Sequence, residues 1–200
     1  MKLMHSTTSP YVRKVDVLLR ESGLIDQVTY TPGSGTPLVP NSETLNVNPL
    51  GKVPALLRDD GPALYDSRVI CRFFDDMAGG KFYPASRLYE VLTLEATADG
   101  ILDAALLMVY EGRLRPEEKR FEDWVEGQWS KINRTLDALN DRWMSHLHGQ
   151  LDMGQIAVGC ALGYLDLRHD TRNWRKDRDP LAAWFEVFAK RDSMIATVPN

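Results

Sequence analysis

Three short stretches of this 200-residue chain place polar groups where a small ligand could bind. Ser9-Pro10 puts a serine at a helix N-cap and a proline at the first helical position. Asp66-Ser67 opens a second helix, whose first N–H groups would attract a carboxylate. Between them, the segment Asn48–Leu57 sets Pro54 at the start of a strand, where the missing N–H is tolerated.

The Val53–Pro54 bond decides what the middle stretch can do. In the cis form the chain turns sharply, and the Val53 N–H and carbonyl face open space, where they can pair with an extended peptide as another strand would. In the trans form Pro54 simply opens an ordinary strand. The residues of this stretch alone leave both forms open.

The elements that would position these stretches form an α/β half of the chain. We expect a strand–helix–strand unit, a loop with one helical turn after Ser42, and then a strand–strand–helix unit. The ranges are a strand at Lys2–His5, a helix at Tyr11–Glu21 closed by Gly23, a strand at Gln27–Thr31, a hairpin of Val53–Leu57 with Pro62–Tyr65, and a helix from Asp66-Ser67 to Gly79-Gly80.

The second half of the chain shows only helical patterns. The expected helices are Ser86–Leu114, softened at Gly100, then Pro116–His146, Asp152–Leu167 and Pro180–Lys190. Asp152 with Gln155 spells a capping box for the third of them. We therefore predict a domain at 1–79 with a mixed four-stranded sheet, a linker at 80–86 and an all-helical domain at 87–200.

Composition narrows the classes of function and the cellular location. The net charge of −4 gives no basic field that would favour nucleic acid or an anionic membrane, and no apolar run is long enough to span a bilayer. The two cysteines fall in separate predicted helices and form neither a disulfide framework nor a metal motif. His146, His148 and His169 have no partners at ligand spacing, so we expect them at the surface. A cytoplasmic location is the simplest interpretation.

Four motifs, in this order, resemble those of the cytosolic glutathione S-transferases, particularly the bacterial members. They are Ser9-Pro10-Tyr11-Val12-Arg13-Lys14-Val15, Asn48-Pro49-Leu50-Gly51-Lys52-Val53-Pro54, Asp66-Ser67, and the helix Ile156–Asp166. The resemblance implies a thioredoxin-like N-terminal domain, a helical bundle domain and a homodimer. It also implies glutathione as co-substrate, no metal, and a role in detoxification.

Residue by residue, the resemblance implies a glutathione site in the first domain. Pro54 matches the family's cis-proline, with the Val53 backbone pairing with the cysteinyl part of glutathione. Asp66 and Ser67 match the pair that holds the γ-glutamyl end. From Glu21 to Gly51 there is no Lys, Arg or His, so Lys52 is the nearest candidate partner for the glycyl carboxylate, and a solvated turn lysine is the alternative.

Ser9 is the expected catalytic residue, because its hydroxyl can cap the helix and still donate to a bound sulfur. Lowering a thiol pKa from about 8.5 by about two units needs roughly 3 kcal/mol. A hydrogen bond to a charged group contributes about 1.5–3 kcal/mol and a helix N-terminus about 0.3–1 kcal/mol, which together suffice. Ser6, Thr7 and Thr8 are near enough in sequence to be alternatives.

The substrate side of the reaction is less defined. Cysteine is absent between Ser6 and Tyr11, so the chain resembles the serine-using members, which add glutathione to a small hydrophobic electrophile. Tyr11 and Met108 are candidates for the second-substrate pocket. A glutathione-dependent isomerase or peroxidase, or a non-catalytic adaptor with the same fold, are the alternatives.

Overall fold

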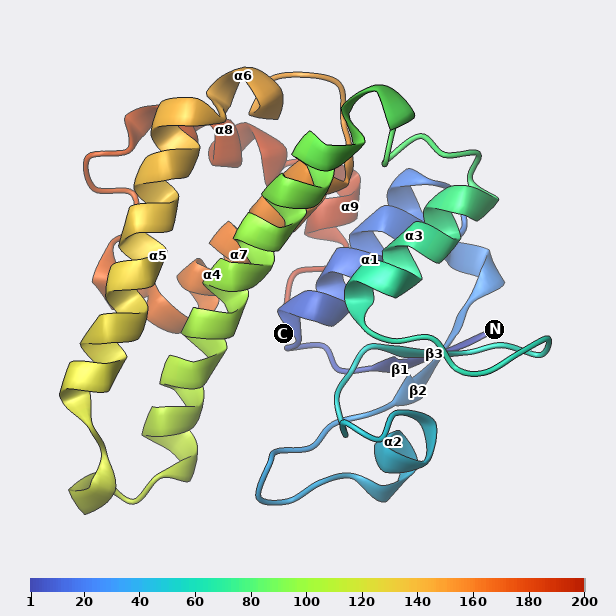
Figure 1. Ribbon diagram of the computed structural model, residues 1–200, viewed down its shortest axis with the longest axis horizontal. Coiled ribbons are helices and arrows are strands. Elements are labelled where there is room, and N and C mark those ends of the chain that lie inside the picture. Colours follow the sequence, from blue (N-terminus) through green and yellow to red (C-terminus); the bar gives the residue numbers. More distant parts are fainter. Residues whose placement is uncertain (200) are drawn as a thin grey trace. The chain divides into compact units, whose positions relative to one another are not determined.

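The computed structural model describes residues 1–199, which divide into two compact units (Figure 1). One unit comprises residues 1–87 together with the C-terminal segment from Asp192, and the other comprises Leu88–Arg191. The sequence analysis placed that C-terminal segment in the helical domain. The segment instead packs on the first unit, where the Met194 carbonyl accepts a hydrogen bond from Arg13 at 3.0 Å and Ser193 donates to Glu21 at 2.5 Å.

A small mixed sheet forms the centre of the first unit. Strands β1 (Lys2–His5), β2 (Thr29–Pro32) and β3 (Ala55–Leu57) lie in the order β2-β1-β3. β1 is parallel to β2, with Leu3 opposite Tyr30, and antiparallel to β3, with Leu3 opposite Leu56. Leu3 and Leu56 are fully buried, so this register fixes which face of the sheet meets the core.

The expected fourth strand at 62–65 is reduced to a single bridge among the described residues. Leu56 and Leu64 exchange two backbone hydrogen bonds of 2.9 Å, and the ladder extends no further. Pro62 has no N–H to donate, and its carbonyl accepts from the Arg58 side chain at 3.2 and 3.3 Å instead of from a strand. The sheet therefore has three strands. β2 also begins later than expected, because Ile25–Gln27 form a 3₁₀ turn.

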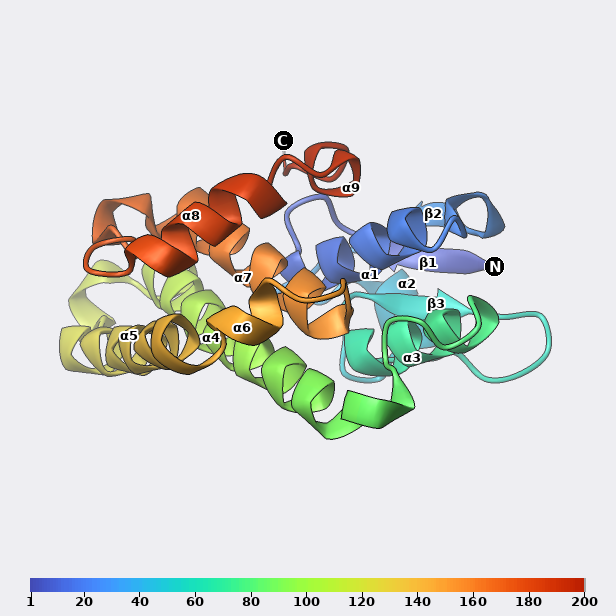
Figure 2. The ribbon, with the colours of Figure 1, turned by 90° about the horizontal axis from the view of Figure 1, so that it is seen from above.

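The first and third helices of this unit begin after the capping residues that the sequence predicted, the second begins at Ser42 and not after it, and the fourth was not predicted. They are α1 (Pro10–Glu21) after Ser9, α2 (Ser42–Val47) after Asn41, α3 (Ser67–Met77) after Asp66, and the short α9 (Asp192–Ile195). Gly79 and Gly80 follow α3 with φ of +89° and +72°, a conformation that favours glycine. α1 and α3 pack side by side (Figure 2). They place two helix N-termini in the same unit.

The helical unit contains the four predicted helices and one short additional helix. They are α4 (Leu88–Leu114), α5 (Glu122–Arg142), α6 (Met144–Leu147), α7 (Met153–His169) and α8 (Asp179–Phe188), with 3₁₀ turns at Glu117–Lys119 and Asp170–Arg172. A further 3₁₀ turn, Ala85–Arg87, ends the main segment of the first unit. α4 runs unbroken through Gly100, contrary to expectation, and the two residues that follow the glycine, Ile101 and Leu102, are buried in the core of the unit. Within the described residues, none of these helices is long and apolar enough to cross a membrane.

The start of α7 confirms the capping box and corrects the placement of one histidine. Asp152 is fully buried, and its side chain accepts from the Gln155 N–H while Gln155 accepts from the Asp152 N–H. The second carboxylate oxygen of Asp152 accepts from His146 Nε2 at 2.8 Å. His146 is therefore a structural partner of the cap and not the surface residue that its sequence spacing suggested.

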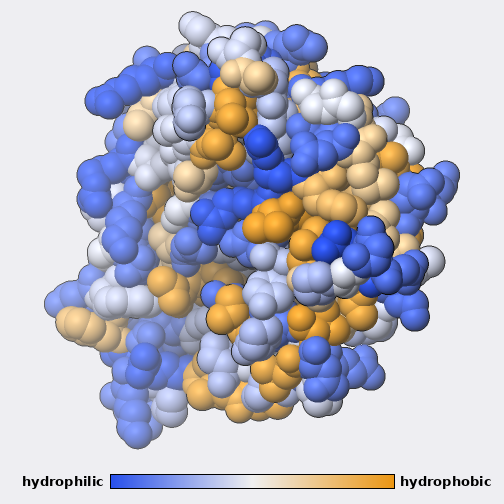
Figure 3. All heavy atoms as spheres, turned by 45° about the vertical axis from the view of Figure 1, so that its right-hand side comes forward, coloured by the Kyte–Doolittle hydropathy of each residue, from blue (hydrophilic) through white to orange (hydrophobic). Residues whose placement is uncertain are grey.

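Hydrophobic side chains also reach the surface. Orange hydrophobic spheres alternate with blue hydrophilic ones over the face drawn in Figure 3. In the first unit, Leu38, Val39 and Leu50 are 68%, 72% and 65% exposed, and all three belong to the segment between β2 and β3.

Candidate functional site

The connection from β1 to α1 carries the hydroxyl groups that the sequence singled out. Ser9 adopts an extended conformation (φ −81°, ψ 119°), and its Oγ accepts from the Val12 N–H at 3.3 Å. The Ser9 N–H donates to the Ser6 carbonyl at 3.1 Å, which closes the turn between them. Among the described residues the Ser9 hydroxyl donates to no acceptor, so its hydrogen is available to a ligand.

The segment before β3 confirms the cis form of the Val53–Pro54 bond. Asn48 organises this segment, because its amide donates to the Lys52 carbonyl at 2.9 Å and its Oδ1 accepts from the Leu50 N–H at 3.0 Å. Within residues 1–199, neither the N–H nor the carbonyl of Val53 makes a hydrogen bond. A backbone pair at the entry to a strand is thus free to pair with an extended ligand.

Strand register brings Val53 to the same level as the Ser6–Ser9 turn. β1 and β3 are antiparallel with Met4 opposite Ala55. Extending that register by two residues sets Val53 opposite Ser6. The space is tight on the other side, where a Cβ at Gly33 would lie 2.9 Å from Val53 Cγ1.

The start of α3 holds the third predicted stretch. Asp66 caps the helix through a 3.0 Å bond from the Arg68 N–H and forms an ion pair with the Arg68 side chain at 2.8 Å. Burial by itself would raise the Asp66 pKa, but hydrogen bonds from Arg68 and the charges of Arg68 and Lys14 outweigh it, so the pKa lies below its ordinary value. Asp66 remains 52% exposed and ionised at neutral pH, while Ser67 is buried. The Tyr65–Asp66 peptide bond is also cis.

Two cations on α1 are enclosed, and the sequence carried no indication of their burial. Lys14 is 0% exposed and Arg13 is 8% exposed. α1 packs against α3 and the C-terminal segment, which enclose Arg13 and Lys14. Lys14 is the functional candidate of the two, since its charge acts on Asp66. Lys14 lies five residues after Ser9, and nothing in the sequence around it distinguishes a buried lysine from a solvated one.

The remaining predicted residues are not brought together within one unit. Lys52 is exposed in the turn before Val53. Tyr11 is half-buried on α1 of the first unit, whereas Met108 is buried on α4 of the helical unit. Among the described residues no group of three or more His, Cys, Asp or Glu side chains could hold a metal ion.

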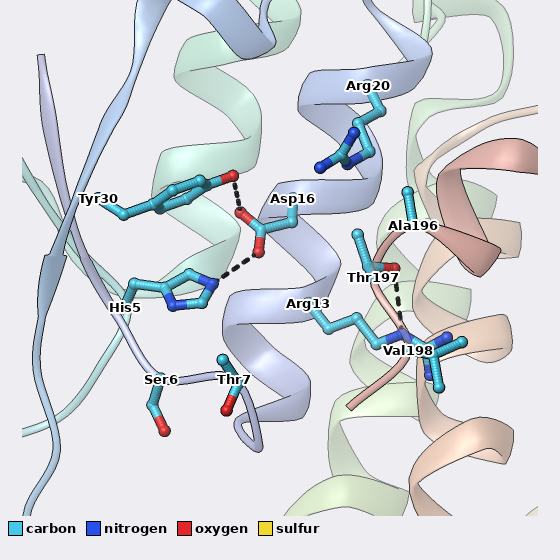
Figure 4. Close-up of a pocket in the computed structure, with 10 residues that line it drawn as sticks. All are labelled: His5, Ser6, Thr7, Arg13, Asp16, Arg20, Tyr30, Ala196, Thr197 and Val198. Atoms are coloured by element: carbon cyan, nitrogen blue, oxygen red, sulfur yellow. Dashed lines mark hydrogen bonds and ion pairs between the residues drawn. The ribbon is translucent and has the colours of Figure 1, made fainter. Parts of the chain in front are cut away.

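A pocket of about 170 Å³, lined by residues of β1, β2, α1 and the C-terminal segment, was also missed (Figure 4). Its centre is the Asp16 carboxylate, which accepts from His5 Nε2 at 3.0 Å and from the Tyr30 hydroxyl at 2.9 Å. Burial, and then the neighbouring Asp16 charge, raise the Tyr30 pKa. Ser6 and Thr7 line this pocket, but none of Val53, Pro54, Asp66 and Ser67 does. The pocket is thus separate from the three predicted ligand-binding stretches.

Comparisons with known proteins agree with this arrangement. Residues 8–77 match the glutathione S-transferase N-terminal domain, and residues 122–186 match the glutathione S-transferase C-terminal domain. The chain is 35% identical to the uncharacterized GST-like protein YibF of Escherichia coli K12, over 100% of this chain and 98% of that one.

Solved structures give the same result. A glutathione transferase family member from Pseudomonas fluorescens Pf-5, crystallised with bound glutathione, is 44% identical, with a TM-score of 0.97 over 100% of this chain and 98% of that one. A glutathione S-transferase from Methylobacillus flagellatus KT, also with glutathione bound, is 35% identical, with a TM-score of 0.87 over 100% of this chain and 99% of that one. The chain belongs to the glutathione S-transferase family.

Proposed function

We propose that the protein is a glutathione transferase in which Ser9 activates the thiol of glutathione. The observation that carries the proposal is the free backbone pair of Val53 beside cis-Pro54, set level with the turn that ends at Ser9. Glutathione is an extended peptide, and a strand entry with an unused N–H and carbonyl is suited to its cysteinyl part. The relatives crystallised with glutathione support the same ligand.

Ser9 stabilises the thiolate in this proposal. Its hydroxyl donates to the sulfur while its Oγ still accepts from the Val12 N–H, so capping and activation do not compete. The hydrogen bond and the N-terminus of α1 together contribute about 2–4 kcal/mol, enough to lower the thiol pKa by about two units. The thiolate sulfur then forms a bond to an electrophilic carbon. With an aryl chloride the C–Cl bond breaks and chloride leaves with the electron pair, while the thiol proton goes to solvent.

The two ends of glutathione would be held by charged and backbone groups. Asp66 takes the ammonium group of the γ-glutamyl end, because it is ionised and half-exposed, and the first N–H groups of α3 at Ser67 receive the adjoining carboxylate. The exposed ammonium of Lys52 takes the glycyl carboxylate. Lys14 adds a buried positive charge beside Asp66, which keeps Asp66 ionised.

The second substrate is proposed to be a small hydrophobic electrophile, with Tyr11 and Met108 contributing to its site. A second crystal structure of the Pseudomonas fluorescens Pf-5 protein contains S-(propanoic acid)-glutathione, a glutathione with a short organic substituent on sulfur. This supports a site that accepts glutathione with a group attached to its sulfur. A cytoplasmic location stays a prediction from composition.

The test combines glutathione titration by calorimetry with turnover of chlorodinitrobenzene. Ser9→Ala should lower kcat/KM about 10- to 100-fold, the range of a charged hydrogen bond. Ser22→Ala is the matched control, because Ser22 lies at the other end of α1 and bonds the Leu19 carbonyl. It should change turnover by less than about twofold. Absence of binding at millimolar glutathione would overturn the proposal, and unchanged turnover in Ser9→Ala would transfer the role to Ser6, Thr7 or Thr8.

We also infer a homodimer, and the exposed apolar segment of the first unit supports it. Leu38, Val39 and Leu50 are exposed apolar side chains between β2 and β3, which a second copy could cover. Light scattering should give twice the chain mass of 22.7 kDa. Val39→Asp should shift the mass toward the monomer if this segment is the contact. A native chain that elutes as a monomer at micromolar concentration would contradict the inference.

A further inference from the structure

The pocket of Figure 4 lies wholly within the first unit and contains none of the residues assigned above to glutathione. Its walls come from β1, α1, β2 and the segment that follows α9. Arg20, Tyr30 and Ala196 are exposed, so the space is open to a ligand from solvent. With a volume of about 170 Å³ it can admit a small molecule, and its charged side chains decide which kind.

Three charged side chains of α1 line this pocket. Arg13, Asp16 and Arg20 follow one another at spacings of three and four residues, so they share one face of the helix. Asp16 lies between the two arginines along the helix (Figure 4). With His5 neutral, two positive groups and one negative group give the pocket a formal charge of +1.

Neither arginine forms an ion pair with an acid among residues 1–199. Arg13 is only 8% exposed, and its Nη2 and Nε donate to the Met194 carbonyl at 3.0 Å and the Thr197 hydroxyl at 3.3 Å, both neutral acceptors. The equally buried Arg178 of the helical unit, by contrast, has Asp137 at 2.7 Å. A buried cation without a counter-ion is costly, so Arg13 favours an anionic group in the pocket.

Asp16 is held in place and can still accept further hydrogen bonds. Its Oδ2 accepts from His5 Nε2 at 3.0 Å, and its Oδ1 accepts from the Tyr30 hydroxyl at 2.9 Å. A carboxylate offers about four acceptor positions, so each oxygen has one left. A purely anionic ligand would be repelled by Asp16, and a purely cationic one by the two arginines. The pocket therefore suits a ligand that carries both signs of charge.

We propose that this pocket binds a free acidic amino acid of the size and charge of L-glutamate. The ammonium group is bound by Asp16, the α-carboxylate by Arg13 and the side-chain carboxylate by Arg20, because a guanidinium group matches a carboxylate with two parallel N–H donors. The ligand's ammonium and α-carboxylate share one carbon atom, which suits the neighbouring Asp16 and Arg13. Its net charge of about −1 at neutral pH complements the +1 of the pocket. This second site does not depend on the glutathione transfer proposed above.

Calorimetric titration of the native chain with three matched ligands tests the proposal. Glutarate keeps both carboxylates of L-glutamate and lacks the ammonium group, whereas L-glutamine keeps the amino-acid end and lacks the second carboxylate. The native chain should bind L-glutamate at least about tenfold more tightly than either, because each analogue loses a charged hydrogen bond.

Two variants connect these preferences to their residues. Arg20→Met should weaken L-glutamate binding about tenfold and remove its advantage over L-glutamine, because the side-chain carboxylate loses its partner. Asp16→Asn should remove the advantage over glutarate. Arg20 is exposed, so Arg20→Met keeps the test decisive if Asp16→Asn folds poorly. Arg142→Met removes the same charge from an exposed position of α5 and should bind L-glutamate as the native chain does.

L-glutamate has the same charged groups as the γ-glutamyl end of glutathione, so a further variant separates the two sites. Asp66→Asn should leave L-glutamate binding within about twofold of the native chain, because Asp66 does not line the pocket. Binding that falls in Asp66→Asn and not in Arg20→Met would place the amino acid at the glutathione site and overturn the inference. Equal affinity for the three ligands, equal effects of Arg20→Met and Arg142→Met, or no binding at about 10 mM L-glutamate would overturn it as well.

Discussion

The N-termini of α1 and α7 follow one capping rule and differ in what the capping side chain has left to offer. Ser9 caps α1 with a single accepted hydrogen bond and keeps its hydroxyl hydrogen. Asp152 caps α7 from a fully buried position, where Gln155 and His146 use both of its carboxylate oxygens. A capping side chain whose hydrogen-bonding groups are all in use can only stabilise the fold. A capping side chain with an unused donor can also bind a ligand. The same capping pattern in the sequence therefore has a structural role in one unit and belongs to a candidate site in the other.

The largest change in stability is expected at the Asp152 cap of α7, whose two carboxylate oxygens both accept hydrogen bonds. Asp152→Ala removes the cap of α7 and leaves the Gln155 N–H and His146 Nε2 without the carboxylate that accepts from them, so stability should fall by about 3 kcal/mol. Urea denaturation measures the loss. Asp123→Ala, in the exposed first turn of α5, is the matched control and should cost less than about 0.5 kcal/mol. Similar losses in both variants would remove the distinction between the two kinds of cap.

The unused donor of Ser9 can be separated from its capping role with Ser9→Asp. Aspartate caps a helix about as well as serine, so stability should stay within about 0.5 kcal/mol of the native chain. Its carboxylate has no hydrogen to donate and repels a thiolate, so kcat/KM should fall about 100-fold or more. Denaturation and chlorodinitrobenzene turnover are measured on the same preparation. A stable variant with native turnover would show that the Ser9 hydroxyl does not act on sulfur.

A smaller loss of stability is expected in the pocket of Figure 4, where the Asp16 carboxylate already accepts from both His5 and Tyr30. Tyr30→Phe removes the donor to Asp16 and leaves His5 as the remaining partner of that carboxylate in Figure 4. Tyr30 is 43% exposed, so solvent screens the bond and the loss should be about 1 kcal/mol. Urea denaturation measures it, with turnover per folded molecule unchanged. A fall in turnover at native stability would instead give this pocket a part in the reaction.

Local chemistry made some of these features predictable from sequence, and tertiary packing concealed the others. The caps at Ser9, Asp66 and Asp152 are set by residues within one helical turn, so they could be read directly, and the motif around Pro54 added the cis bond. The prediction of a fourth strand was wrong because its hydrogen bonds depend on contacts across a turn, where the Arg58 side chain donates to the Pro62 carbonyl. The burial of Lys14 depends on how whole helices pack, and it has no counterpart in the local pattern.

Asp66, the cap of α3, is intermediate between Ser9 and Asp152, because it is charged but half exposed. The pH dependence of the stability that it contributes is the smallest effect expected. Burial alone would raise the Asp66 pKa, but Arg68 and then Lys14 lower it below the ordinary value of 3.8. A carboxyl whose folded pKa is depressed contributes stability that is present above the unfolded pKa and lost as pH falls through the folded pKa.

The native chain should therefore exceed Asp66→Asn in stability near neutral pH, and the difference should vanish below the folded pKa. Because Asp66 and Arg68 are each about half exposed, screening keeps the difference below about 0.5 kcal/mol. Urea midpoints of the two chains, measured stepwise from about pH 6 toward acid, show whether the difference shrinks as the carboxyl is protonated. A difference that persists at the lower pH would come from the cap's geometry and not from the charge that we assign to the ammonium group of glutathione.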